Sequence, residues 1–189
     1  MKHIAIFASG NGTNASAIIE YFQHHPSIKI SLVLTNNPEA GVIKVAHAQK
    51  IISTIVSRDF FCNEERMLKL LNALNIDMIV LAGFLQLVPE FLLNKFPSRI
   101  INIHPALLPK HGGKGMYGMK VHQAVLESGE KESGITVHFV NEHYDKGEII
   151  LQKTVVVAAV ETPETLSAKV LALEHEWYPK TIEKNSTII

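Results

Sequence analysis

Cysteine and long apolar runs are both scarce in this sequence. The single cysteine, Cys62, excludes a disulfide within the chain. The longest apolar stretch, Met78–Leu85, is far shorter than the roughly 20 residues of a membrane-spanning helix. The N-terminal run Ile4–Ala8 is likewise too short for the apolar core of a signal peptide. We therefore expect a soluble, cytoplasmic protein without a membrane partner.

An excess of charge of one sign is also missing. The 18 lysines and arginines balance 18 aspartates and glutamates, and charged residues make up 19% of the chain. This balance argues against a dedicated nucleic-acid binder, which needs an excess of basic side chains. Hydrophobic residues make up 47% of the 189 positions, which excludes a disordered, collagen-like or coiled-coil chain. We expect residues 1–189 to form one domain with a sizeable core.

Short apolar runs alternate with segments of helical periodicity in the first half of the chain. Strands are predicted at Ile4–Ala8, Ile28–Thr35, Ile52–Val56, Met78–Ala82 and Ile100–His104. The helices between them are predicted to begin at the caps Asn14 and Asn63 and to include Val42–Lys50 and Pro89–Phe96. This alternation predicts an α/β fold, in which helices cover both faces of a doubly wound, mostly parallel sheet.

The pattern changes after residue 105. A long stretch rich in glycine covers residues 106–120, and a helix is predicted at Val121–Ser128. Two further strands, Ile135–Val140 and Ile149–Val157, are separated by a short connection, and we expect them to add an antiparallel pair to the sheet. Thr162 is expected to cap the last helix.

The segment Ser9–Ala15 (SGNGTNA) joins the first strand to the first helix, where a doubly wound sheet binds its ligands. Its glycines let the backbone approach a ligand closely, and free N–H groups at the helix start attract phosphate. The spacing also fits a variant of the dinucleotide fingerprint, but the acid this fingerprint needs is missing where the second strand ends at Thr35. We favour a phosphate or other anion over a dinucleotide, and a tight turn without a ligand stays open.

Asn102 and His104 lie two residues apart on one strand, so both side chains project from the same face. They sit at the carboxyl end of that strand, where an amide and an imidazole can stabilise an oxyanion and move a proton. Asp145 follows in a distant turn and would raise the pKa of His104 if the two side chains meet. The plain alternative is a satisfied polar pair at a strand end, with Asp145 as an ordinary turn residue.

Other motifs are weaker. The ten histidines are scattered and form neither an H-E-x-x-H motif nor a cluster with cysteine, so we expect no metal. No G-x-S-x-G motif is present, which disfavours a serine hydrolase. The glycine-rich loop (residues 111–119) lacks the Walker pattern, and we predict that it is a mobile loop or lid near the ligand.

Four motifs together resemble one enzyme family. They are SGNGTN at 9–14, LAGFLQLVP at 81–89, INIHPALLPK at 101–110 and GITVHFVNEHYDKGEII at 134–150. The chain resembles, over about residues 2–180, the folate-dependent formyltransferases that act on glycinamide ribonucleotide in purine synthesis. The resemblance implies a Rossmann-like formyltransferase fold, 10-formyltetrahydrofolate as the co-substrate, and no metal.

The resemblance also implies roles for individual residues. Asn102 and His104 match the catalytic asparagine and histidine, and Asp145 matches the acid that raises the histidine pKa. The residues that match the ribonucleotide site are Gly12, Thr13 and Asn14 at the phosphate, Glu174 at the ribose hydroxyls, and Leu171. The residues that match the folate site are Leu85, Gln86, Leu87, Val88, Asn102, Asn141, Glu142, His143, Tyr144 and Asp145.

The sequence departs from the family pattern at several places. The glycine-rich loop is longer than the short Pro-Gly loop common in the family. Leu171 stands where a polar residue is expected near the substrate, and Gln86 replaces a frequent arginine. Arg58 and Arg66 are both candidates for the arginine that some relatives use for the folate tail.

Related functions stay open as alternatives. A methionyl-tRNA formyltransferase normally carries a C-terminal tRNA-binding domain, and a formyltetrahydrofolate deformylase an N-terminal regulatory domain. We expect neither enzyme, because the sequence shows no such additional domain. A nucleotide-binding module without chemistry would explain the glycine loop but not the set of Asn102, His104 and Asp145. Nothing in the sequence indicates an oligomeric state.

Overall fold

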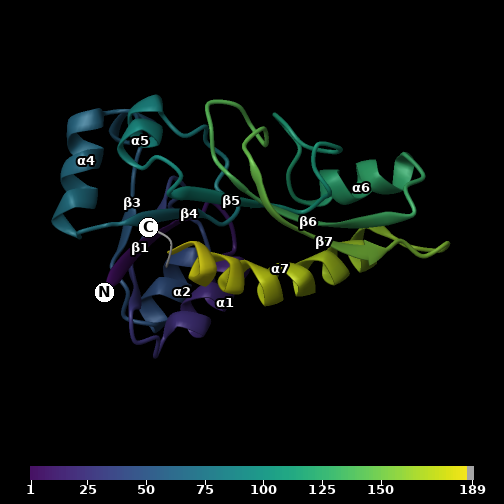
Figure 1. Cartoon of the computed structure of the whole chain (residues 1–189), viewed down its shortest axis with the longest axis horizontal. Helices are drawn as coiled ribbons and strands as arrows, with labels where there is room; N and C mark the ends of the chain where they lie inside the picture. Colours follow the sequence, from purple (N-terminus) through teal and green to yellow (C-terminus); the bar gives the residue numbers. More distant parts are fainter. Residues whose placement is uncertain (187–189) are drawn as a thin grey trace.

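The structure, a computed structural model, describes residues 1–186. A seven-stranded sheet runs through it in the order β3-β2-β1-β4-β5-β6-β7 (Figure 1). Its strands are β1 (Lys2–Phe7), β2 (Ile28–Thr35), β3 (Ser53–Ile55), β4 (Met78–Leu81), β5 (Ile100–His104), β6 (Glu132–Phe139) and β7 (Ile149–Val156). Strands β1 to β5 run parallel, and β6 and β7 add an antiparallel pair, which confirms the predicted fold class.

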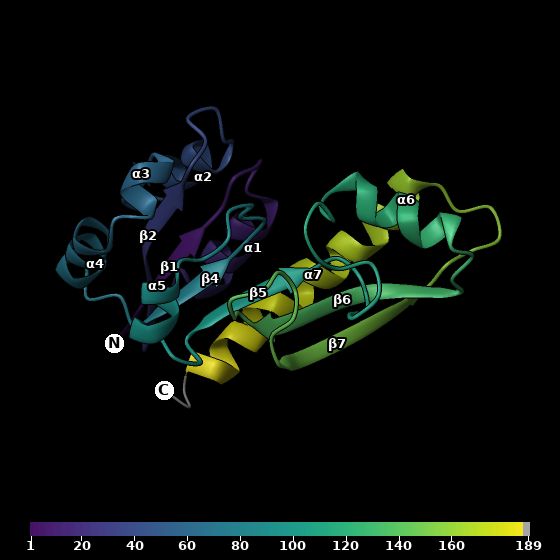
Figure 2. The same ribbon diagram turned by 90° about the horizontal axis from the view of Figure 1, so that it is seen from above.

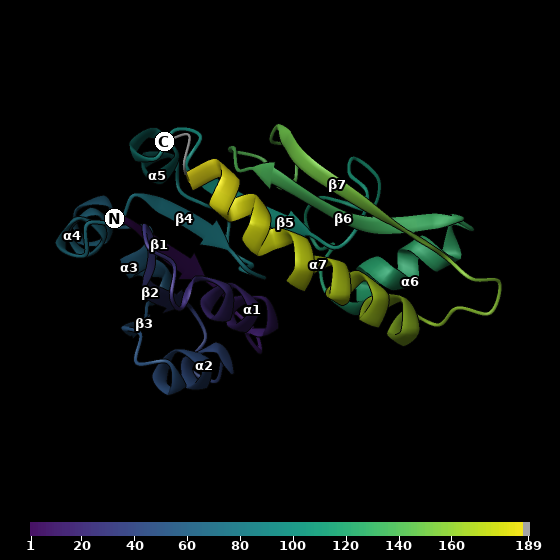
Figure 3. The same ribbon diagram turned by 60° about the horizontal axis from the view of Figure 1, so that its bottom comes forward.

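Helices cover both faces of this sheet. They are α1 (Thr13–Phe22), α2 (Val42–Ala48), α3 (Arg58–Phe61), α4 (Glu64–Ala73), α5 (Glu90–Lys95), α6 (Met119–Glu127) and α7 (Pro163–Ser186). Figure 3 shows the long helix α7 crossing the sheet obliquely beside α1. Figure 2 shows the β6–β7 pair extending away from the N-terminal helices, with α6 near its far end. Among the helices of residues 1–186, none is long and apolar enough to cross a membrane.

Two apolar clusters fill the space between the sheet and its helices. The side chains of β1 alternate between them: Ile4 and Ile6 join the cluster under α1, α2 and α7, whereas Ala5 and Phe7 join the cluster under α3, α4 and α5. Because both faces are covered, β1 is apolar at every position from Ile4 onward. Its continuous apolar run, which predicted a buried strand, follows from this double cover.

Several helix starts can be compared with the caps expected from sequence. The side chain of Asn63 caps α4 by accepting a hydrogen bond of 3.0 Å from the backbone N–H of Arg66, as predicted. The prediction that Asn14 caps α1 is wrong, because the cap is Gly12 and α1 begins two residues earlier than expected, at Thr13. Gly12 has φ 83°, and a Cβ there would lie 2.8 Å from Val42. The position therefore requires glycine for both its backbone conformation and its packing.

The strand order reverses direction at β1. From β1 the chain builds outward through β2 and β3, and it then returns to place β4 and β5 on the other side of β1. In sheets of this kind, a crevice forms beyond the carboxyl ends of the strands at the reversal. The topology thus places the loop after β1 and the loop after β4 on two sides of one potential ligand site.

Candidate active site

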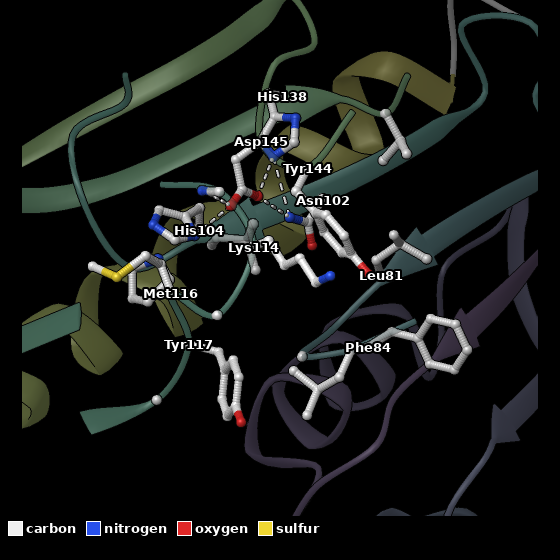
Figure 4. Close-up of a pocket in the computed structure, with 18 of the residues that line it drawn as sticks. Leu81, Phe84, Asn102, His104, Lys114, Met116, Tyr117, His138, Tyr144 and Asp145 are labelled. Carbon is white, nitrogen blue, oxygen red and sulfur yellow. Dashed lines mark hydrogen bonds and ion pairs between the residues drawn. The ribbon is translucent and has the colours of Figure 1, made fainter. Parts of the chain in front are cut away.

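A cavity of about 510 Å³ opens at the carboxyl ends of β1, β4 and β5. The first turn of α1 contributes Asn14, the loop after β4 contributes residues 83–88, and the end of β5 with the residue that follows it contributes residues 102–105. Figure 4 shows that side chains from the β6–β7 connection and from the glycine-rich loop complete the wall. The cavity therefore lies where the reversal of strand order predicts a ligand site.

Asn102 lies directly opposite His138 in the antiparallel pair of β5 and β6. Opposed residues share one face of a sheet, and the amide Nδ2 of Asn102 lies 3.1 Å from Nε2 of His138. Nδ1 of His138 donates to the backbone carbonyl of Phe139 at 2.8 Å, which leaves Nε2 as the acceptor for Asn102. The sheet register therefore sets the orientation of the Asn102 side chain.

Asp145 reaches the same place from the connection between β6 and β7. Backbone pairing of Phe139 N–H with the Glu148 carbonyl closes this connection at 2.9 Å. Gly147 makes the closure possible, since a Cβ there would lie 1.7 Å from the Phe139 carbonyl oxygen. Asp145 has φ 55°, the left-handed conformation that aspartate tolerates better than most residues. A tight loop thus folds the carboxylate back over the face that carries Asn102.

The Asp145 carboxylate lies among a backbone N–H, an amide and two imidazoles. It accepts a 2.8 Å bond from the backbone N–H of Gly113 and lies 3.4 Å from Nδ2 of Asn102. His104 Nδ1 and His138 Nε2 each lie 3.5 Å from one of its oxygens. Burial acts to raise the Asp145 pKa, but the imidazoles and the Gly113 N–H outweigh it and hold the pKa below its ordinary value. The carboxylate therefore stays ionised at neutral pH.

His104 is 3% exposed and has an acceptor at each ring nitrogen. Nδ1 faces Asp145, and Nε2 donates to the backbone carbonyl of His111 at 2.8 Å. Burial lowers the pKa of His104 below its ordinary value, and the negative charge of Asp145 opposes this shift. The predicted meeting of His104 and Asp145 is thus present in the structure, and the net direction of the His104 pKa is set by burial.

A second acid lies at the α7 side of the cavity. Glu174 is 7% exposed and accepts a 2.8 Å hydrogen bond from Nδ2 of Asn14. Burial raises the Glu174 pKa to about 7, although the bond from Asn14 acts to lower it. The other amide atom of Asn14, Oδ1, is buried without a partner among the described residues. These two side chains together present hydrogen-bond acceptors to a ligand.

Most residues singled out from the sequence line this one cavity. They include Asn14, Leu85, Gln86, Leu87, Val88, Asn102, His104, Asn141, His143, Tyr144, Asp145, Leu171 and Glu174. Gly12, Thr13 and Glu142 do not line it among the described residues, and neither do Arg58 and Arg66. Gly12 is instead buried against Val42.

His138 and His122 were missed by reasoning from the sequence. Both line the cavity and are buried, and Nδ1 of His122 has no partner within residues 1–186. The signal for His138 is its register opposite Asn102, which requires the alignment of two strands far apart in sequence. In the described part of the chain, no three His, Cys, Asp or Glu side chains form a group that could hold a metal ion.

Comparison with known proteins places this cavity in a family context. The family model for formyl transferases matches residues 2–182. The Arabidopsis thaliana protein named "Phosphoribosylglycinamide formyltransferase, chloroplastic" is 41% identical over an alignment of 187 residues, and the match covers 96% of this chain and 64% of the plant protein. The chain thus spans slightly less than two thirds of that relative.

Two bacterial proteins cover nearly the same length. Bacillus subtilis phosphoribosylglycinamide formyltransferase is 35% identical over 97% of this chain and 94% of its own. The crystal structure of phosphoribosylglycinamide formyltransferase from Bacillus halodurans superposes with a TM-score of 0.86 at 35% identity, over 97% of this chain and 94% of that one. Because the family model spans nearly the whole chain and these relatives match it end to end, the chain belongs to the formyl transferase family.

Proposed function

We propose that this protein transfers a formyl group from 10-formyltetrahydrofolate to the amine of glycinamide ribonucleotide, a step of purine biosynthesis. The observation that carries the proposal is the meeting of Asn102, His104 and Asp145 in the wall of one cavity. The names of the relatives supply the substrates, and the cavity supplies groups suited to this chemistry.

Formyl transfer needs one bond to form and one to break. The amine nitrogen of the ribonucleotide bonds to the formyl carbon, and the bond from that carbon to N10 of the folate then breaks. One proton leaves the amine and ends on N10. Holding both substrates in one cavity removes much of the entropic barrier to the attack. The chain itself must stabilise the negative oxygen of the tetrahedral intermediate and help the proton to move.

Asn102 and His104 are suited to stabilising that oxygen. The Nδ2 of Asn102 carries two N–H groups, and the one directed to Asp145 is held only at 3.4 Å, so a substrate oxygen can replace this acceptor. Nε2 of His104 donates to the His111 carbonyl, and the substrate oxygen competes with that carbonyl. Removing one such donor typically slows a reaction on the order of 10²- to 10³-fold.

Asp145 supports His104 through charge. Its carboxylate faces Nδ1, so it stabilises the imidazolium and opposes the effect of burial on the His104 pKa. It also fixes which ring nitrogen faces the substrate. The pair is thereby suited to pass a proton from the attacking amine towards the departing nitrogen, directly or through water.

The remaining walls fit the two substrates. Glu174 and Asn14 Oδ1 offer acceptors to ribose hydroxyls, and the N-terminus of α1 lies close by for the phosphate. Residues 85–88, with Asn141, His143 and Tyr144, line another part of the cavity, where apolar side chains and backbone groups suit a flat heterocycle such as the pterin. Gly12 and Thr13 serve in this scheme through their backbone N–H groups.

The test is formyl transfer followed by absorbance, with 10-formyltetrahydrofolate in the presence and absence of glycinamide ribonucleotide. We expect turnover only when both are present, with formylated ribonucleotide as the product by mass spectrometry. His104→Ala should lose on the order of 10²- to 10³-fold in kcat. The control is His24→Ala, since His24 is exposed and does not line the cavity.

The other outcomes identify different functions. Release of formate from the folate without an acceptor would indicate a hydrolase. Binding of the ribonucleotide without turnover under any condition would indicate a nucleotide-binding module. Equal activity in the His104 and His24 variants would contradict the assignment of the site.

A further inference from the structure

A lysine side chain enters the cavity, and it belongs to the glycine-rich loop. Among the described residues that line the cavity, Lys114 is the only lysine, and there is no arginine. The same wall holds the carboxylates of Asp145 and Glu174. A substrate phosphate that enters this space meets two acidic side chains, and Lys114 is the cation that can offset them.

The glycine-rich loop holds Lys114 at the tip of a tight turn. Gly113 and Gly115 flank it with φ 99° and 89°, a left-handed conformation that glycine adopts without strain. The backbone N–H of Met116 donates to the Gly113 carbonyl at 3.1 Å and closes the turn. Figure 4 shows the Lys114 side chain reaching from this turn into the cavity, between Asn102 and Phe84.

The catalytic pair itself anchors the glycine-rich loop. The Gly113 N–H donates to Asp145, and the His111 carbonyl accepts from His104, each at 2.8 Å. Between these anchors, Gly112 packs so closely that a Cβ there would lie 2.4 Å from Leu108 Cδ2. The position of Lys114 is thus tied to the same two residues that are proposed to carry the reaction.

The ammonium group of Lys114 is available to a ligand. Within residues 1–186 it makes no hydrogen bond or ion pair. Lys110, at the start of the same stretch, is by contrast paired with Glu130 at 2.8 Å and lies outside the cavity wall. A flexible four-carbon stem lets the Lys114 charge follow a bound anion over several ångströms.

Apart from its histidines, the rest of the wall offers a phosphate little positive charge. The part of α7 that lines the cavity contributes Ser167, Val170, Leu171 and Glu174, and Leu171 is apolar where the family resemblance predicts a polar side chain. The loop after β1 offers backbone N–H groups but no basic side chain. A second source of negative charge, the glutamate tail of the folate, is flexible and can remain in water. The phosphate is therefore the anion with the greater need of a cation.

We propose that Lys114 binds the phosphate of the ribonucleotide substrate when the glycine-rich loop is docked on Asp145. This inference rests on the proposed function and adds a substrate-binding residue to it. It assigns to the glycine-rich loop a positive charge that the cavity-lining residues of α7 do not supply. It also makes recognition of the phosphate depend on a loop that contacts the catalytic pair.

The test compares Lys114→Met, which keeps the length of the side chain and removes its charge, with the wild-type protein. We expect KM for glycinamide ribonucleotide to rise about 10- to 100-fold, the typical loss for a charged hydrogen bond, with little change in kcat. Lys114→Arg should restore most of the affinity. Calorimetric titration with the ribonucleotide alone, in which no turnover takes place, should show the same loss of affinity. The matched control is Lys131→Met, which removes an exposed charge outside the cavity.

Two further ligands separate the possible sources of the anion. With the glycinamide ribonucleoside, which lacks the phosphate, wild type and Lys114→Met should behave alike. An unchanged KM for the ribonucleotide, or an equal loss with the ribonucleoside, would overturn the inference. The inference would also be overturned if Lys114→Met raised KM only for the formyl donor and if this rise disappeared with a donor that lacks its glutamate tail. A wild-type protein that neither binds nor formylates the ribonucleotide would instead overturn the proposed function, which distinguishes the two failures.

Discussion

Replacing Asp145 with asparagine removes one buried charge and keeps the shape of the side chain. The amide oxygen of the variant can still accept the hydrogen bond from Gly113, so the glycine-rich loop should remain docked. The variant loses the attraction between the carboxylate and Nδ1 of a protonated His104, which lie 3.5 Å apart. At an effective dielectric constant of about 20, two unit charges at this distance attract each other by about 5 kcal/mol.

The net effect is smaller than that attraction. Both charges are spread over two atoms, and the neighbouring imidazole and N–H groups stay in place, so we take about half of it. Without the Asp145 charge, the pKa of His104 falls further below its ordinary value, and each 1.36 kcal/mol of lost attraction changes the protonation equilibrium tenfold. The protonated fraction of His104 at pH 8 then falls about 100-fold. We expect kcat to fall by the same factor, with the KM for glycinamide ribonucleotide largely unchanged.

The assay is kcat at saturating substrates over a range of pH, expressed as the ratio of wild type to Asp145→Asn. Because the substrates are the same, their own titration cancels in the ratio. The ratio should be near 100 at alkaline pH, where His104 is mostly neutral in both proteins, and it should shrink as the pH falls and His104 becomes protonated, first in the wild type and then in the variant. Asp77→Asn serves as the control, since Asp77 also loses a charge and keeps its bond to the His3 N–H.

Three results would refute this reasoning. A variant with a rate near that of the wild type would show that the Asp145 charge does not matter. A ratio that is independent of pH would show that the loss does not act through the protonation of His104. A loss that falls on KM alone would place Asp145 in substrate binding and not in the support of His104.

The remaining predictions concern stability. Because the pKa of Glu174 is raised to about 7, the folded state binds this proton more tightly than the unfolded state, and the free energy of unfolding should fall by about 3 kcal/mol as pH rises from below 4.5 to above 7. Urea unfolding at pH 5 and pH 8 should show that this part of the pH dependence is lost in Glu174→Gln, and an unchanged dependence would contradict it. The Tyr178 hydroxyl lies 2.8 Å from the Leu81 carbonyl and 3.2 Å from the Ile101 carbonyl, so Tyr178→Phe should cost about 1–3 kcal/mol, whereas equal urea midpoints would show that these bonds contribute little. Phe61→Ala should cost about 3–5 kcal/mol by the same measurement, since its ring is 1% exposed, and a kcat within twofold of wild type should show that the cavity is intact.

Much of the fold could be predicted from the sequence because its signals are local. Apolar runs such as Ile4–Ala8 mark strands that are covered on both faces, and the cap at Asn63 is made three residues away. Predictions failed where the deciding contact is distant. Gly12 and not Asn14 caps α1, because Gly12 packs against Val42 and Asn14 bonds to Glu174.

The same contrast between local signals and distant contacts holds for the residues of the candidate site. Asn102 and His104 could be predicted as a pair because one strand places both of them on the same face. His138 could not, since its contact with Asn102 depends on the register of β5 against β6. The bond from His104 to the His111 carbonyl depends on the path of the glycine-rich loop, which no local pattern determines.

The two acids of the cavity show how such distant contacts decide chemistry. Asp145 and Glu174 carry the same functional group, and both are largely buried, yet their pKa values move in opposite directions. Asp145 meets two imidazoles and a backbone N–H, which favour its charged form, whereas Glu174 meets a single neutral amide. The first can therefore hold a permanent charge beside His104. The second changes protonation near pH 7, so its charge in the wall of the cavity depends on pH.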